Sequence, residues 1–131
     1  MNFHISTSNR IELVDITREV LFEVGKSGVD DGIAMVYVPH ATATLLINEN
    51  ERGLVSDITG AITRLIDWDR AYEHDRIDDN AASHITSALL GCSLTLPVTG
   101  GQLVRGTWQN IFLVELDGPR RRRVVVKVIG E

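Results

Sequence analysis

The stretch "GTWQNIFLVELDGPRRRRVVVKVIGE", residues 106–131, decides how the fold is read. It holds two apolar runs separated by Asp117, Gly118 and Pro119, three residues of types that are strong turn formers. Apolar runs of this length that flank a turn predict two β-strands, and the turn is expected to bring the second strand back alongside the first. The second run opens with four arginines, Arg120 to Arg123, which the period of two residues divides between the two faces of the strand.

Outward from this stretch, the sequence predicts further strands around a helical middle. Leu54, Ile58 and Ile62 recur at helical spacing and predict the clearest helix, over residues 51–68. Two more helices are expected over residues 15–28 and 79–91, with Asp15 or Thr17 as the candidate cap of the first and Asp79 or Asn80 as that of the second. Strands are expected over residues 2–7, 32–40, 41–49, 93–98, 102–117 and 120–131. This order lacks a regular βαβ alternation and favours one compact α+β domain over residues 1–131, with a mainly antiparallel β-sandwich and about three helices.

The composition is that of one ordinary globular domain. The chain has 131 residues, 44% of them hydrophobic and 24% charged. A net charge of −5 argues against a general nucleic-acid binder, and no apolar run is long enough for a membrane helix. The only cysteine is Cys92, and no secretory signal is visible, so a cytoplasmic location is expected.

Three histidines are candidates for a metal site. His40 follows a predicted buried strand, His74 lies in an acidic loop, and His84 falls within the helix predicted over residues 79–91. Three imidazoles suit zinc, nickel, copper or iron, whereas magnesium prefers oxygen ligands. The spacing alone favours a capped helix that follows a solvated acidic loop. Aspartates of this loop are candidates to orient a ligating ring: Asp75, Asp78 and Asp79.

The position of His84 on its helix supports a buried role. At about 100° per residue, His84 lies at the edge of an apolar face and needs a polar partner there. This expected face consists of Ala81, Ile85, Ala88 and Leu89.

Two carboxylates stand where general acid or base chemistry is possible. Asn48 and Glu49 close a predicted strand. Either Asn48 or Asn50 caps the next helix, with Glu49 and Glu51 favourable near its positive end, or the Asn48 amide orients a substrate and the Glu49 carboxylate acts as acid or base. Glu115 lies within an apolar strand and either faces solvent or pairs with a charge across the sheet. The arginines after the turn form either an anion site or a charged edge strand that prevents aggregation.

Three motifs in this sequence resemble those of the YjbQ-like family, small bacterial and archaeal proteins described as secondary thiamine-phosphate synthases. They are "PHATATLLINEN" (39–50), "YEHDRIDDNAASHITSALLG" (72–91) and "GTWQNIFLVELDGPRRR" (106–122). They occur in the family's order and at matching separations, and the likeness covers nearly the whole chain.

The resemblance implies an α+β fold with a β-sandwich, assembled as a homotrimer, with a small-molecule substrate and neither nucleic acid nor membrane as partner. It implies His40, His74 and His84 as ligands of a divalent metal, zinc first, with nickel, iron or manganese as alternatives. It implies a site wall with Glu49 and Glu115 as acid or base groups. The implied substrate-binding residues are Asn48, Trp108, Gln109 and Arg120.

The implied reaction joins a hydroxymethylpyrimidine pyrophosphate to a thiazole phosphate and releases pyrophosphate. Such a step usually needs oxygen-bound magnesium and cationic side chains, and a three-histidine site suits magnesium poorly. The expectation is therefore a metal-dependent enzyme for a small phosphorylated or heteroaromatic molecule, with thiamine-phosphate synthesis as a main or a side reaction. The alternative is a non-catalytic trimeric module that binds a metal or ligand.

Overall fold

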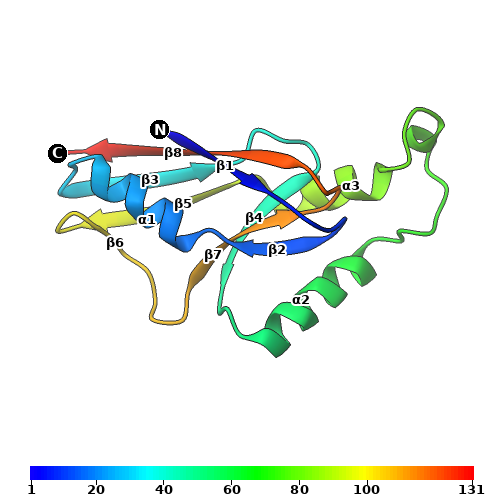
Figure 1. Ribbon diagram of the computed structural model, residues 1–131, viewed down its shortest axis with the longest axis horizontal. Helices are drawn as coiled ribbons and strands as arrows, with labels where there is room; N and C mark the ends of the chain where they lie inside the picture. Colours follow the sequence, from blue (N-terminus) through cyan, green and yellow to red (C-terminus); the bar gives the residue numbers. More distant parts are fainter.

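Eight strands form two antiparallel sheets in the computed structural model, which describes residues 1–131 (Figure 1). The five-stranded sheet has the order β1 (Asn2–Ser6), β8 (Arg121–Gly130), β3 (Asp31–Tyr37), β5 (Ser93–Thr99) and β6 (Gln102–Leu103). The three-stranded sheet has the order β2 (Glu12–Asp15), β7 (Asn110–Glu115) and β4 (Ala43–Asn48). Every strand pair is antiparallel, and three α-helices accompany the sheets, so the predicted α+β class is confirmed.

The turn at Asp117–Pro119 carries the chain from one sheet to the other. The sequence predicted that the strands on its two sides would lie alongside each other, but β7 pairs with β2 and β4, whereas β8 pairs with β1 and β3. The N-terminal segment holds the turn in place, since Gly118 N donates to Arg10 O at 3.0 Å. A Cβ atom at Gly118 would overlap the Asn9 carbonyl and the side chain of Glu115, so only glycine fits there.

Both sheets contribute to one core. Helix α1 (Thr17–Lys26) buries Val20 and Val24 in it, because these residues lie on one face at a spacing of four. They pack with apolar residues from the inner faces of both sheets: Ala34, Val36, Leu45, Leu96, Val98, Ile111, Leu113, Val124 and Val126. The helix begins at Thr17, later than predicted, because residues 12–15 form β2, a strand that the sequence reading missed.

Helix α2 (Arg52–Leu65) lies beside the three-stranded sheet (Figure 1). It contributes to a smaller core in which Ile62 packs with Val114 and Leu116, with Ile58 at its edge. The residue that caps this helix is Glu51, whose carboxylate accepts from Gly53 N and Leu54 N, so the predicted cap at Asn48 or Asn50 was wrong. None of the helices is long and apolar enough to cross a bilayer.

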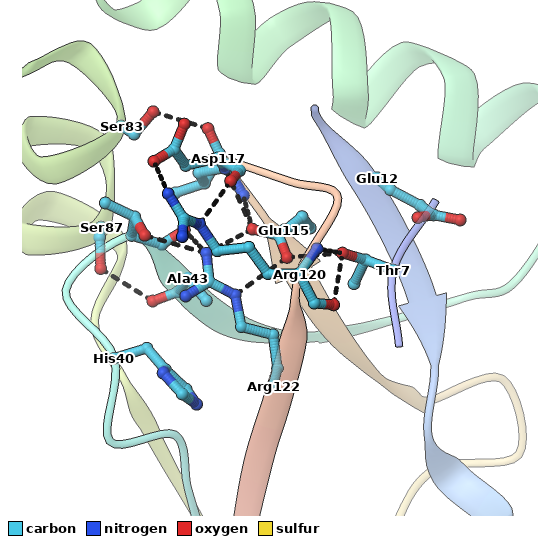
Figure 2. Close-up of polar contacts among 12 residues, drawn as sticks. Thr7, Glu12, His40, Ala43, Ser83, Ser87, Glu115, Asp117, Arg120 and Arg122 are labelled. Carbon is cyan, nitrogen blue, oxygen red and sulfur yellow. Dashed lines mark hydrogen bonds and ion pairs between the residues drawn. The ribbon is translucent and has the colours of Figure 1, made fainter. Parts of the chain in front are cut away.

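Helix α3 (Ala81–Leu90) turns small polar residues inward. Ser83 Oγ donates to Leu116 O at 2.6 Å, and Ser87 Oγ donates to Ala43 O at 2.8 Å (Figure 2). The predicted apolar face was wrong in its C-terminal half, because Ala81 is buried but Ala88 and Leu89 are exposed. The hydroxyls face carbonyl oxygens at the ends of β4 and β7, and buried carbonyls need such donors.

Candidate functional site

His74 and His84 lie together at the start of α3. His74 belongs to a short 3-10 helix, η1 (Glu73–Arg76), and its ring stands edge-on to that of His84, with the ring centroids 4.7 Å apart. Asp75 joins the two segments, because its carboxylate accepts from Tyr72 N at 2.9 Å and from Ala81 N at 3.3 Å. Asp75 therefore links the loop to the helix through backbone N–H groups, and neither of these hydrogen bonds orients a histidine ring.

Asn80 connects this histidine pair to the turn between the two sheets. Its Oδ1 lies 3.1 Å from His74 Nε2, and its Nδ2 donates to Asp117 Oδ2 at 2.8 Å. The Asn80 side chain is buried, with only 5% of the residue exposed. A chain of polar contacts thus runs from the turn, through one amide, to the imidazole of His74.

Asp117 and Arg120 form the far end of this chain (Figure 2). The guanidinium of Arg120 donates through Nη2 to Asp117 Oδ2 at 2.9 Å and through Nε to Asp117 O at 2.8 Å. Burial tends to raise the pKa of Asp117, but hydrogen bonds from Asn80 and Arg120 and the Arg120 charge outweigh it and lower the pKa. Asp117 is therefore ionised at neutral pH, and Arg120 keeps donors free on its exposed side.

Glu115 and Arg122 form a buried ion pair between the two sheets (Figure 2). Arg122 Nε donates to Glu115 Oε1 at 2.9 Å, and its Nη2 contacts Glu115 Oε2 and donates to Thr42 O at 2.9 Å. Thr7 Oγ1 also donates to Glu115 Oε1, at 2.7 Å. The prediction that Glu115 pairs with a charge holds in substance, but the partner lies in the other sheet rather than across the same one.

The surroundings of Glu115 assign it a structural role. Its Oε2 also accepts from Leu116 N at 3.1 Å and from Asp117 N at 3.0 Å. Burial tends to raise the pKa of Glu115, but the Arg122, Asp117 and Thr7 hydrogen bonds lower it overall. A fully buried, ionised carboxylate whose two oxygens both accept several hydrogen bonds is poorly suited to the acid or base role predicted from the sequence.

His40 lies beside the same arginines, away from any metal-ligand group. Its Nε2 accepts the backbone N–H of Arg123 at 2.8 Å. Burial lowers the pKa of His40, and the charge of Arg122 lowers it further, so the ring is neutral with its proton on Nδ1. In this tautomer Nδ1 carries the proton and the Nε2 lone pair accepts the Arg123 N–H, so neither ring nitrogen is free for a metal ion.

The other predicted site residues lie at the opposite end of the three-stranded sheet. β4 and β7 pair Ala43 with Glu115 at one end and Asn48 with Asn110 at the other. These two ends are five residues apart, about 17 Å along the strands. Within one chain, the sheet therefore separates the end that carries Glu115 from the end that carries Asn48.

An open pocket of about 390 Å³ lies at the Asn48 end. Glu49 and Trp108 line it together with Asn50, Glu51, Thr107 and Asn110. Trp108 is 71% exposed and precedes β7 instead of opening it. Gln109 closes the turn before the strand, since its Oε1 accepts from Gly106 N at 2.7 Å, which gives this predicted substrate-binding side chain a structural partner.

Asp15 organises this end, and the sequence reading considered it only as a helix cap. Its Oδ2 accepts from Asn50 Nδ2 and from Asn110 Nδ2, each at 2.8 Å, and its Oδ1 accepts from Thr17 Oγ1 at 2.6 Å. Burial opposes ionisation of Asp15, but these hydrogen bonds together lower its pKa. Three segments distant in sequence therefore meet at one carboxylate.

A metal ion would find two imidazoles here rather than three. No group of three or more His, Cys, Asp or Glu side chains is arranged to hold a metal ion within the single chain. The pair of His74 and His84 fits such an ion, because His74 has a hydrogen-bonded amide behind it, as metal-binding histidines usually have. Further ligands would come from solvent, from a substrate or from a second copy of the chain.

From the sequence, two important residues of this region were predicted only to form local structure. Asn80 was a possible helix cap and Asp117 was a turn former, yet neither side chain caps a helix here. Their meeting depends on the crossing between sheets, which no local pattern encodes. The sequence did contain one signal. Asn80 lies in the same motif as the two histidines, and Asp117 lies in the same motif as the arginines.

The chain matches one protein family along its whole length. A family model described as UPF0047 protein YjbQ-like matches residues 1–131. A UPF0047 protein of Archaeoglobus fulgidus is 45% identical over 129 residues, which cover 98% of this chain and 100% of the relative. The UPF0047 protein YugU of Bacillus subtilis is 38% identical over 128 residues, which cover 96% of each chain.

Solved structures agree with this similarity. The crystal structure of a YbjQ-like protein of unknown function from Sulfolobus solfataricus superposes with a TM-score of 0.98 at 48% identity, covering 100% of this chain and 96% of that one. A conserved hypothetical protein of Thermus thermophilus superposes with a TM-score of 0.85 at 30% identity, covering 98% of this chain and 99% of that one.

Proposed function

Because the chain belongs to the YjbQ-like UPF0047 family, we propose that it is a metal-dependent enzyme for a small phosphorylated or heteroaromatic molecule. The observation that carries this proposal is the pair of His74 and His84, whose ring centroids lie 4.7 Å apart. Hydrogen bonds through Asn80 connect His74 to an ionised Asp117, which in turn holds the half-exposed Arg120. Two imidazoles linked in this way to a guanidinium offer one site for a borderline metal and one for an anion. The expected cytoplasmic location belongs to the same proposal.

The ion proposed for this site is divalent, with zinc first and nickel, iron or manganese as alternatives. When bound, it would supply a Lewis acid that polarises a substrate oxygen or activates a water. His74 and His84 hold it, and Asn80 orients His74. His40 is left out of this refined ligand set, because its Nε2 already accepts the Arg123 N–H.

Arg120 is the proposed anchor for a phosphate. A guanidinium has five N–H donors, and Asp117 takes two of those of Arg120. The remaining donors lie on a side chain that is 51% exposed, so a phosphate can reach them without breaking the ion pair. Asp117 then fixes the direction of the guanidinium instead of competing for the substrate.

The pocket of Glu49 and Trp108 is the proposed second contact region. An exposed indole beside a carboxylate suits a flat heterocycle that carries N–H donors. One small molecule cannot span the distance between the two ends of the sheet in a single chain. If both ends act on the same substrate, they come from different copies, which is consistent with the proposed homotrimer.

Apolar residues on the open face of the five-stranded sheet support self-association. Ile33 and Ile129 face each other in the β3–β8 register and are 48% and 59% exposed, and Tyr37 follows on the same face of β3. Exposed apolar groups that cluster on one face favour contact with another protein surface. We expect Ile129→Glu to lower the assembled mass in light scattering, whereas Arg52→Glu, an exposed position on α2 outside this sheet, should leave it unchanged.

Thiamine-phosphate synthesis is the reaction to test first. The test is growth of a thiamine auxotroph that lacks its own synthase, with the wild-type chain or His74→Ala at ordinary and at high expression. Rescue by the wild-type chain alone at ordinary expression supports a main reaction, and rescue only at high expression supports a side reaction. Equal rescue by both chains would reject a role for the histidine pair in this reaction.

The alternative is a non-catalytic trimeric module in which the histidines hold the subunits together. His74→Ala would then change the oligomer in light scattering. The same substitution in an enzyme would leave the oligomer intact and remove metal binding. These two readouts separate the proposals without knowledge of the substrate.

A further inference from the structure

We infer that Asn80, held by Asp117, fixes His74 in the tautomer that carries its proton on Nε2, so that Nδ1 is the lone pair this site offers. The inference deepens the proposed function, on which its metal-binding consequence rests. It makes Asn80 a positioning residue that acts through His74. It also identifies Nδ1 of His74 as the ligand atom, which the residue type alone does not determine.

The direction of each hydrogen bond follows from the carboxylate. Asp117 is ionised and already accepts from Arg120, so it can only accept from its other neighbours. The end of the Asn80 amide that lies 2.8 Å from Asp117 Oδ2 must therefore be the NH₂ group. The carbonyl oxygen of the same amide is then the end that faces His74.

The amide oxygen in turn fixes the imidazole. Asn80 Oδ1 lies 3.1 Å from His74 Nε2, and an amide oxygen only accepts hydrogen bonds. Nε2 must therefore donate and carry the proton. In the neutral ring the lone pair is then on Nδ1, which is the atom available to a metal ion or to a substrate proton.

The Asn80 side chain is free for this task. It occupies the N-cap position of α3 but makes no capping hydrogen bond, because Asp75 accepts from Ala81 N instead. It is also buried, so water competes poorly for its amide. Removal of the side chain should therefore affect His74 more than it affects the helix.

The metal-binding consequence concerns affinity. Groups that donate to or accept from the far nitrogen of a ligating histidine typically change metal affinity by about 10- to 100-fold. We expect Asn80→Ala to weaken Co²⁺ binding by about that factor. Asn50→Ala is the matched control, since it breaks another asparagine–aspartate hydrogen bond at the far end of the sheet.

The direct test is nuclear magnetic resonance of the metal-free full-length chain with ¹⁵N-labelled histidine. Long-range ¹H–¹⁵N spectra at about pH 8, where an ordinary histidine is neutral, show which ring nitrogen carries the proton. We expect a proton on Nε2 of His74, with contacts to Asn80, and exchange with water at least about tenfold faster in Asn80→Ala but unchanged in Asn50→Ala. A proton on Nδ1 of wild-type His74, or equal exchange in Asn80→Ala, would overturn the inference.

The two levels of the proposal fail separately. The tautomer is read without metal, so a proton on Nε2 with no Co²⁺ binding by the wild-type chain would reject the proposed metal site and keep the positioning role. Co²⁺ binding by the wild-type chain together with a proton on Nδ1 of His74 would keep the proposed metal site and reject the positioning role of Asn80. If Asn80→Ala does not fold, the wild-type spectrum alone decides, because it reports the proton position directly.

Discussion

Asn80 Nδ2 lies 2.8 Å from Asp117 Oδ2, and this single hydrogen bond ties the candidate site to the crossing between the two sheets. Asn80 precedes α3, and Asp117 lies in the turn that leads from β7 to β8. The site is therefore built on the point where the fold changes sheets. The geometry of the site depends on how rigidly this crossing between the sheets is held. The neighbouring Glu115–Arg122 ion pair contributes to that rigidity.

Removal of the Arg122 charge should strongly destabilise the fold. Arg122→Met would leave the fully buried Glu115 carboxylate without its ion-pair partner. Loss of one partner of a buried pair typically lowers the free energy of unfolding by about 3–5 kcal/mol. Urea unfolding followed by circular dichroism measures this loss.

Arg121→Met is the matched control for that substitution. Arg121 is the exposed neighbour on the same strand, and changes at such positions usually stay within about 0.5 kcal/mol. Equal losses for Arg121→Met and Arg122→Met would contradict the structural role given to the Glu115–Arg122 pair.

The free energy of unfolding should fall in two separate stages as the pH is lowered. In the unfolded chain His40 gains a proton near its ordinary pKa of 6.5, whereas burial and Arg122 lower the pKa of His40 in the fold. The unfolded state then binds more protons, so the free energy of unfolding falls as the pH drops below about 6.5. The second stage belongs to carboxylates with lowered pKa values, Asp15, Glu115 and Asp117, and begins near their ordinary values of 3.8 to 4.5.

His40→Gln separates the two stages. Its amide oxygen can still accept the Arg123 N–H but does not titrate, so the loss of stability that begins below pH 6.5 should disappear while the acid stage persists. Chemical unfolding across this pH range provides the measurement. An unchanged slope in the variant would show that His40 is not its source.

Trp108 should matter for ligand binding and not for folding. It is 71% exposed beside Glu49, so Trp108→Ala should change the free energy of unfolding by less than about 0.5 kcal/mol. Loss of a stacking surface should raise the Kd for a hydroxymethylpyrimidine phosphate probe about tenfold. Trp108→Phe keeps a ring and should bind nearly as well as the wild-type chain, whereas equal affinity in Trp108→Ala would rule out the proposed stacking.

The sequence identified the fold class because its signals are local and periodic. The spacing of Leu54, Ile58 and Ile62 gave α2, and the apolar runs beside Asp117–Pro119 gave β7 and β8. The short strand β2 was missed because four residues show too little alternation. The pairing of β7 and β8 was misread because a turn signal does not say which sheet the next strand joins.

The site could be predicted only in part, for the same reason. His74 and His84 lie ten residues apart, so a loop that folds back on its helix brings them together. Asn80 and Asp117 meet only through the crossing between the sheets. The inward face of α3 was misjudged because carbonyl oxygens at the strand ends select Ser83 and Ser87, and no hydrophobic period reveals such a demand.

We propose that His74 and His84 hold a divalent metal ion. Calorimetric titration of Zn²⁺ and Co²⁺ into the tag-free, metal-stripped chain measures this binding, with His74→Ala, His84→Ala and the exposed His4→Ala compared in parallel. We expect one ion per chain for the wild-type protein and for His4→Ala, and loss of that binding in both of the other variants. Binding of equal strength and stoichiometry in all four proteins, or no binding in any, would contradict it.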